Sequence, residues 1–212
     1  MPMKTTFGEI LHSDDRILVI DKPSGLLSVP GIGSEKQDVL ATRAARQFKG
    51  ARIVHRLDRD TSGVIVMALD AEAHRHLSMQ FQDREVEKSY IAIVQGIVKG
   101  EHGEITLPLR KDMDNPPRQI VDHDQGKWAS TKWRVIERNE DRTRLELTPL
   151  TGRSHQLRVH LLQIGHPILG DDLYAPPEAL NASSRLMLHA LTLSLVHQET
   201  ASPMSFTAPF PF

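Results

Sequence analysis

The chain has no cysteine, no long apolar run and no internal repeat. Without cysteine it can form no disulfide framework, no thiolate nucleophile and no zinc site built on thiolates. No stretch approaches the roughly 18 apolar residues that suggest a membrane span. The first six residues lack the apolar segment of a signal peptide. We therefore expect a soluble cytoplasmic protein with no membrane partner.

The composition that remains is that of an ordinary globular protein. The chain has 212 residues, of which 39% are hydrophobic and 25% charged, and this is enough to bury a sizeable core. We expect a single domain over residues 1–212. No exposed apolar helix is evident in the sequence, so we expect a monomer.

The net charge of −1 counts against a large non-specific nucleic-acid binder. Basic residues nevertheless concentrate in two stretches, Arg43 to Arg59 and Arg134 to Arg158. Charge alone fits either a local basic cleft or a solvated face, and the solvated face is the simpler interpretation.

Apolar patterning predicts strands alternating irregularly with helices. The expected strands cover 16–20, 63–69, 87–95, 130–137, 143–148, 186–196 and 204–207. The expected helices cover 38–48, with Asp38 as a cap, 70–82, and 154–164 with Leu157, Leu161 and Ile164 facing inward. Residues 110–124 contain Pro116-Pro117 and many polar side chains, which favours a loop. Several neighbouring strands can pair as hairpins, so we expect an α+β fold with a mixed, largely antiparallel central sheet and flanking helices.

A cluster of polar residues stands directly before an apolar, β-branched run. Residues 53–69 read IVHRLDRDTSGVIVMAL. Arg56 and Arg59 lie beside Asp58, and neighbouring guanidinium groups keep a carboxylate ionised. An ionised carboxylate on a loop fixed by a strand can act as a nucleophile or a base. By itself the segment fits more simply a carboxylate that caps a turn at Thr61-Ser62-Gly63.

Several segments together resemble the RluA-type pseudouridine synthases. They are His55-Arg56-Leu57-Asp58-x-x-Thr61-Ser62-Gly63-Val64, then Lys22 to Pro30 (KPSGLLSVP), Lys88-Ser89-Tyr90, Leu150 to Arg158 (LTGRSHQLR), Leu169-Gly170-Asp171 with Tyr174, and Leu188-His189-Ala190. They follow the order expected for that family and cover about residues 16–207. The resemblance implies a mainly antiparallel catalytic fold, conversion of uridine in RNA to pseudouridine, and no cofactor or metal.

The same resemblance implies roles for individual residues. Asp58 matches the catalytic aspartate, Tyr90 the aromatic residue that stacks on the flipped base, and Arg153 the arginine that pairs with the aspartate. Without the family match, Tyr90 fits a core aromatic on a strand and Arg153 a surface charge. A phenol near C5 of uracil could also relay the proton that leaves that carbon.

Further residues are candidates for contact with RNA. Arg56 matches the arginine that enters the gap left by the flipped nucleotide, because chemistry on a stacked base requires its extrusion. Leu188 resembles the apolar wall opposite Tyr90, or is only a core leucine. Four further side chains are expected either to contact phosphates or to support the cleft: His55, His155, Gln156 and Arg158.

The nature of the RNA follows less directly. Because the first motif starts near residue 16, we expect no S4-type RNA-binding domain. The sequence most resembles the dual-specificity branch, which modifies stem-loops of 23S ribosomal RNA and the tRNA anticodon arm. Residues 110–127 are the candidate for stem-loop contact.

Three alternatives stand beside this interpretation. One is a synthase without an S4 domain that acts on another tRNA uridine. A second is the related family acting on small-subunit ribosomal RNA, which usually has glycine where this chain has His55. A third is an RNA-binding protein without catalysis, for which loss of Asp58, Tyr90 or Arg153 would be expected. A metal-dependent hydrolase lacks a plausible ligand set, since His155 and His160 do not have the i, i+4 spacing of a helical zinc pair and His74 and His76 fit an exposed helix face.

Overall fold

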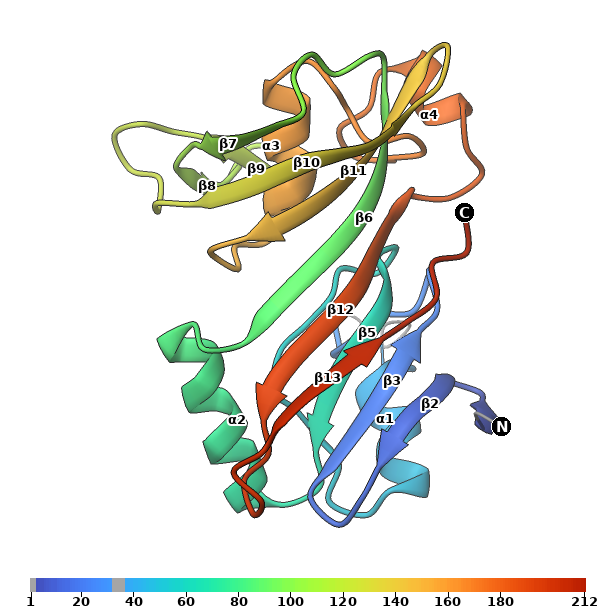
Figure 1. Cartoon of the computed structure of the whole chain (residues 1–212), viewed down its shortest axis with the longest axis vertical. Coiled ribbons are helices and arrows are strands. Elements are labelled where there is room, and N and C mark those ends of the chain that lie inside the picture. Colours follow the sequence, from blue (N-terminus) through green and yellow to red (C-terminus); the bar gives the residue numbers. More distant parts are fainter. Residues whose placement is uncertain (1–2, 32–36) are drawn as a thin grey trace. The chain divides into compact units, whose positions relative to one another are not determined.

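The computed structural model describes residues 3–31 and 37–212. The chain forms two compact units, the first containing Met1–Lys88 and His189–Pro211 and the second Ser89–Leu188 with Phe212. The chain passes from the first unit to the second within strand β6 (Glu87–Gln95) and returns at the start of β12 (Leu188–Val196) (Figure 1). No helix within the described residues has the length and apolar character needed to cross a membrane.

The first unit contains a sheet in the order β1-β2-β3-β5-β12, with β13 paired to β12 and β4 paired to β5. All these pairs are antiparallel except β5 with β12, which is parallel. Every residue of β5 is buried. The bounds are Met3–Thr5 for β1, Gly8–Ser13 for β2, Ile17–Lys22 for β3, Arg52–Ile53 for β4, Ser62–Ala68 for β5 and Pro203–Thr207 for β13.

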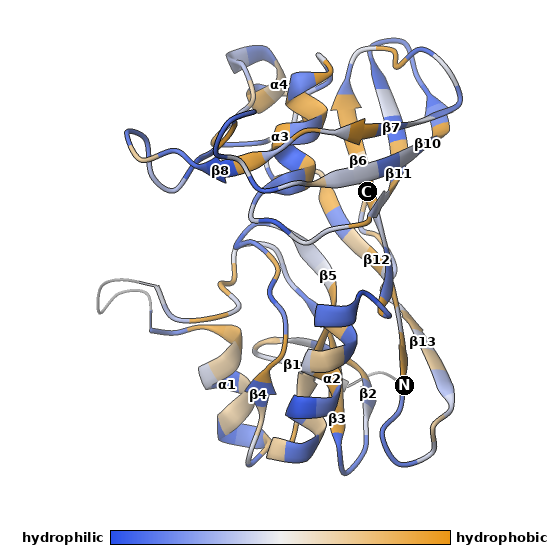
Figure 2. Ribbon diagram, turned by 90° about the vertical axis from the view of Figure 1, so that its left-hand side faces the viewer, coloured by the Kyte–Doolittle hydropathy of each residue, from blue (hydrophilic) through white to orange (hydrophobic). Residues whose placement is uncertain are grey.

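Two helices, α1 (Leu40–Gln47) and α2 (Ala71–Asp83), belong to the first unit. Asp70 caps α2 as predicted, because its carboxylate accepts hydrogen bonds from two main-chain amides of the first turn, each at 2.8 Å. Asp38 does not cap α1: its carboxylate is paired with Arg43 at 2.7 Å, and the helix begins after Val39. Figure 2 shows hydrophilic residues along much of α2 and hydrophobic ones on strands such as β3.

The second unit is an antiparallel sheet in the order β6-β11-β10-β7 with a separate β8–β9 hairpin. Helix α3 packs on the sheet through Leu157 and Leu161, which share a core cluster with Val94, Leu145 and Leu147. The bounds are His102–Thr106 for β7, Leu109–Lys111 for β8, Gln119–Val121 for β9, Ser130–Arg138 for β10, Arg142–Pro149 for β11, Gln156–Gln163 for α3 and Pro177–Asn181 for α4.

The α+β fold with a mixed, largely antiparallel sheet confirms the expected class, and three local expectations need correction. Residues 110–124 are not only loop, because Leu109 is buried and pairs with Val121 across a hairpin. Ile164 does not face inward: it is 36% exposed, since α3 ends at Gln163 and Gly165 turns the chain with a φ of +83°. Strands β1, β2 and β7 were not expected.

Candidate catalytic site

Asp58 lies in the loop between β4 and β5, and the main chain on either side of it is held by residues 22–28, which we call the clamp segment. On the N-terminal side, the hydroxyl of Ser28 donates to the carbonyl of Leu57 at 2.8 Å and accepts from the amide of Leu57 at 3.1 Å. On the C-terminal side, the amide of Gly25 donates to the carbonyl of Arg59 at 2.9 Å. The half-buried Asp58 therefore projects from a backbone fixed at both neighbours.

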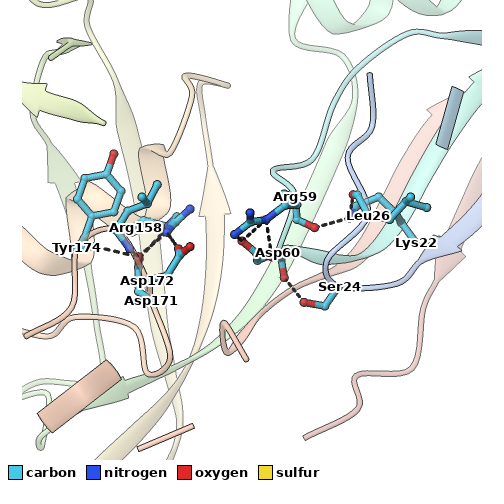
Figure 3. A network of polar contacts seen from close by, with 10 residues as sticks. Lys22, Ser24, Leu26, Arg59, Asp60, Arg158, Asp171, Asp172 and Tyr174 are labelled. Carbon is cyan, nitrogen blue, oxygen red and sulfur yellow. Dashed lines mark hydrogen bonds and ion pairs between the residues drawn. The ribbon is translucent and has the colours of Figure 1, made fainter. Parts of the chain in front are cut away.

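Within the clamp segment, Lys22, the last residue of β3, forms three hydrogen bonds through its side chain. Its side chain is fully buried. The ammonium group donates to the carbonyls of Pro23 at 2.9 Å, Leu26 at 2.7 Å and Arg59 at 3.0 Å (Figure 3). An ammonium group has three donors, and each has a main-chain acceptor, which offsets part of the cost of burying the charge.

A further contact fixes the loop one residue later. The hydroxyl of Ser24 donates to the carbonyl of Asp60 at 2.8 Å. The Asp60 carboxylate pairs with the guanidinium of Arg59 at 2.8 Å (Figure 3). The charge of Asp60 is therefore partnered within the loop.

The loop runs directly into β5, and this junction requires glycine at position 63. Gly63 has a φ of +110°, and a Cβ there would lie 2.1 Å from the carbonyl oxygen of Ala190 on β12. Next to it, the Ser62 hydroxyl lies 2.8 Å from Nδ1 of His189, whose Nε2 lies 3.1 Å from the carbonyl of Ala208. A carbonyl only accepts, so Nε2 carries the proton and Nδ1 accepts from Ser62. The strand expected from Gly63 thus begins one residue earlier, at Ser62.

His55 is half-buried against helix α2 of the first unit. Its ring stacks on Phe81 with centroids 4.4 Å apart, and its Nε2 accepts from the amide of Val66 at 3.1 Å. Burial, together with the positive charge of Lys88, lowers the pKa of His55 to about 3. The neutral ring thus contributes stability above its unfolded pKa, near 6.5, and that contribution is lost as the pH falls towards 3. Of the two expected roles, contact or support, the structure favours support.

The other first-unit candidates differ in exposure. Arg56 is exposed and available to an RNA backbone. His74 and His76 do not lie on a free helix face, because each ring contacts a carbonyl, that of Ile53 at 3.1 Å and that of Val196 at 3.2 Å. Among the described residues, no group of three His, Asp or Glu side chains is arranged to hold a metal ion.

In the second unit, Gln156 fixes the loop that carries Arg153. Its side-chain oxygen accepts from the Thr151 hydroxyl at 2.7 Å and from the amide of Arg153 at 3.0 Å. Its side-chain nitrogen donates to the carbonyl of Ser130 at 2.9 Å and to the hydroxyl of Thr131 at 3.0 Å. Gln156 is buried with both ends of its amide engaged, which favours the second of its two expected roles, support of the cleft, over contact with phosphate.

Arg158 is also internal. It is 2% exposed and forms a two-contact ion pair with Asp171, which is 1% exposed, together with a contact to Asp172 at 2.9 Å (Figure 3). The Asp171 carboxylate also accepts from the amides of Leu173 and Tyr174, each at 3.0 Å. Of the two roles expected for Arg158, this geometry favours support, here of the segment from Leu169 to Tyr174, over contact with phosphate.

Tyr174 joins the β8–β9 hairpin to the Arg153 loop. Its hydroxyl accepts from the amide of Gln119 at 2.7 Å and lies 2.7 Å from Nδ1 of His155. His155 is the residue before α3 and has a left-handed φ of 53°. The guanidinium of Arg158 lies 5.1 Å from the centre of the Tyr174 ring.

We expect Tyr174→Phe to lower the free energy of unfolding by about 1–2 kcal/mol, because the Gln119 amide loses its acceptor while the ring and its cation contacts remain. Urea denaturation measures the loss. Hydrogen exchange at the Gln119 amide should accelerate at the same time. Unchanged exchange at this amide would contradict the linking role.

The remaining candidates are Tyr90, Leu188 and Arg153. Tyr90 is half-buried on β6, packed against the core cluster that contains the buried Leu188. Arg153 is exposed, and its Nε donates to the carbonyl of Trp128 at 3.3 Å. These three belong to the second unit and Asp58 to the first, so the ion pair of Asp58 with Arg153 remains a prediction.

The residues of the clamp segment, together with Tyr174 and His189, lie in the family motifs, but no role could be assigned to any of them from the sequence. The only sequence feature that pointed to these residues was their place in those motifs. The contacts that define them are to main-chain groups or to distant segments, which no spacing rule predicts.

Residues 16–163 match the family model of RNA pseudouridylate synthases. The chain belongs to this family, a class of isomerases that act on RNA, and the expected family and enzyme class are confirmed. It is 52% identical over 198 residues to the dual-specificity RNA pseudouridine synthase RluA of Yersinia pestis, covering 93% of this chain and 96% of the relative. It is 50% identical over 204 residues to the protein of the same name from Escherichia coli K12, covering 96% and 93%.

Two solved structures are similar over almost the whole chain. Human RNA pseudouridylate synthase domain containing 1 has a TM-score of 0.81 and 28% identity, covering 96% of this chain and 83% of that one. Human RNA pseudouridylate synthase domain containing 4 has a TM-score of 0.76 and 27% identity, covering 95% and 88%.

Proposed function

We propose that this chain isomerises specific uridines in stem-loops of 23S ribosomal RNA and of the tRNA anticodon arm, with Asp58 as the catalytic carboxylate. The observation that carries the proposal is the fixed backbone around Asp58, held through Leu57 on one side and Arg59 on the other. A rigid loop places a reacting group reproducibly, which is worth several kcal/mol in a catalysed step. Relatives that bear a dual-specificity name support the pair of substrates.

The chemistry asks little of the protein beyond placement and charge. The C1′–N1 bond of uridine breaks, the uracil turns, a C1′–C5 bond forms, the C5 proton leaves and N1 takes up a proton from solvent. Asp58 either attacks C1′ or removes the 2′ proton. Tyr90 stacks on the flipped base with Leu188 opposite, Arg153 pairs with the Asp58 carboxylate, and Arg56 fills the gap in the stem. No metal or cofactor takes part.

We further propose that residues 1–212 work as a single catalytic domain, as a monomer in the cytoplasm. The sequence motifs support one domain, because residues assigned to a single reaction are divided between the units, Asp58 in the first and Tyr90 in the second. Recognition of a stem-loop would rest on loop shape and splayed bases, as is usual for RNA.

Tritium release from RNA labelled at C5 of uridine tests the proposal, because pseudouridine formation expels that hydrogen. We expect the wild-type chain to release tritium from both a tRNA anticodon stem-loop and a 23S fragment. The same RNAs labelled at C5 of cytidine are the control and should release none. Release from neither uridine-labelled RNA would refute the proposal, and release from full-length tRNA but not from its anticodon stem-loop would favour a synthase of another tRNA uridine.

A further inference from the structure

Trp128 exposes a large aromatic ring in the second unit. It is 47% exposed, whereas Trp133, the other tryptophan of the chain, packs against the core cluster. Tryptophan is highly buried on average, and an exposed one next to charged groups is typical of a binding surface. Nothing in the assigned chemistry uses Trp128.

The backbone that carries Trp128 is held on both sides. Lys127 and Leu109 exchange two main-chain hydrogen bonds, at 2.8 and 2.9 Å, and the carbonyl of Ala129 accepts from the amide of Leu107 at 3.2 Å. The ring is therefore attached to an ordered segment, where a mobile loop tip would be expected for an exposed tryptophan. A preorganised ring loses little conformational entropy when a ligand binds.

Two cationic side chains lie beside Trp128. Its carbonyl accepts from the guanidinium of Arg153, and the neighbouring Lys127 is exposed. Of the acidic groups in residues 110–127, Asp122 is paired with Arg110 and Asp112 accepts from Asn115, whereas Asp114 and Asp124 are exposed. An exposed ring beside cations suits a polyanion with flat bases better than an apolar protein surface.

We propose that Trp128 stacks on an unpaired nucleobase of the substrate RNA, a base other than the target uridine. The inference rests on the proposed function, because Arg153, which contacts the Trp128 backbone, is assigned there to the Asp58 carboxylate. Modification of a base in a stem-loop requires flipping and leaves neighbouring bases splayed, and such bases are stacked on aromatic side chains in RNA complexes. Trp128 thereby adds affinity for the loop and leaves the reacting atoms to Asp58.

The test compares Trp128→Ala, Trp128→Phe and a control, Ile136→Ala, which removes a 43% exposed apolar side chain near the other end of β10. On a uridine-labelled anticodon stem-loop, we expect Trp128→Ala to raise KM and Kd about tenfold, the loss of one stacked base. The loss should appear in KM rather than kcat. Trp128→Phe should restore most of the affinity, and Ile136→Ala should match the wild type.

A fluorescence measurement gives a second readout that does not depend on turnover. In a Trp133→Phe background Trp128 is the sole tryptophan, and stacking on a base should quench its emission when the stem-loop is added. Unquenched emission together with an unchanged Kd for Trp128→Ala would overturn the inference. If the wild type releases no tritium, the proposed function fails, whereas quenching and the Kd ratio still decide the role of Trp128.

Discussion

Asp58→Asn should reduce the rate of tritium release about 10²–10⁴-fold, the range associated with loss of a catalytic acid or base. The substitution keeps the shape of the side chain and removes its negative charge. A neutral amide can neither attack C1′ nor take the 2′ proton. Single-turnover tritium release on the anticodon stem-loop measures the effect.

Structure and binding should survive the same change. The clamp segment holds Leu57 and Arg59 through their main chains, so the Asp58 side chain can change while the loop stays in place. The matched control is Asp60→Asn, which neutralises a carboxylate in the same loop that is paired with Arg59; it should retain most of its activity. A full rate for Asp58→Asn would remove this residue from the mechanism.

Lys22→Met should lower the free energy of unfolding by about 2–4 kcal/mol and slow turnover as well. The buried carbonyl of Leu26 and the part-buried carbonyl of Pro23 lose their donor, and a buried acceptor left unpaired costs about 1–3 kcal/mol. Turnover falls because Arg59 loses one of its two main-chain contacts, and a displacement of about 1 Å at a reacting group can cost 10²-fold. Urea denaturation and tritium release measure the two effects.

The matched control for this prediction is Lys49→Met, the same chemical change at an exposed position of the first unit. Its free energy of unfolding should stay within about 0.5 kcal/mol of the wild type. A Lys22→Met chain as stable and as active as the control would show that the ammonium contacts do not hold the loop.

Much of the fold follows from local pattern. Strands β6, β10 and β11 were expected from their apolar and β-branched residues, and α2 was expected to start at Asp70. The β8–β9 hairpin escaped prediction because its strands are only three residues long and flank a proline pair. Ile164 has the spacing of an inward-facing residue of α3, but the helix ends at Gln163 and the chain turns at Gly165. The exposure of Ile164 is therefore set by this turn and not by the apolar spacing.

The motif residues of the candidate site could be predicted from the sequence, but the buried contacts that hold its loops in place could not. Asp58, Tyr90 and Arg153 came from a family signature. Gln156 and Arg158 were quoted in a family motif with two possible roles, contact with phosphate or support of the cleft, and only the structure shows their buried partners. The contact of Lys22 with Arg59 joins residues 37 positions apart through a carbonyl that every residue has, so no sequence pattern could indicate it.

The clamp segment forms these hydrogen bonds with main-chain groups of the loop and not with its side chains. Lys22, Ser24, Gly25 and Ser28 bind carbonyls and an amide of residues 57, 59 and 60, which are present whatever amino acid stands there. Mutation can therefore exchange the exposed side chain of Arg59, beside Asp58, without removing the main-chain contacts that hold the loop. A lineage of such enzymes is free to change the RNA that it accepts while it keeps the same reaction.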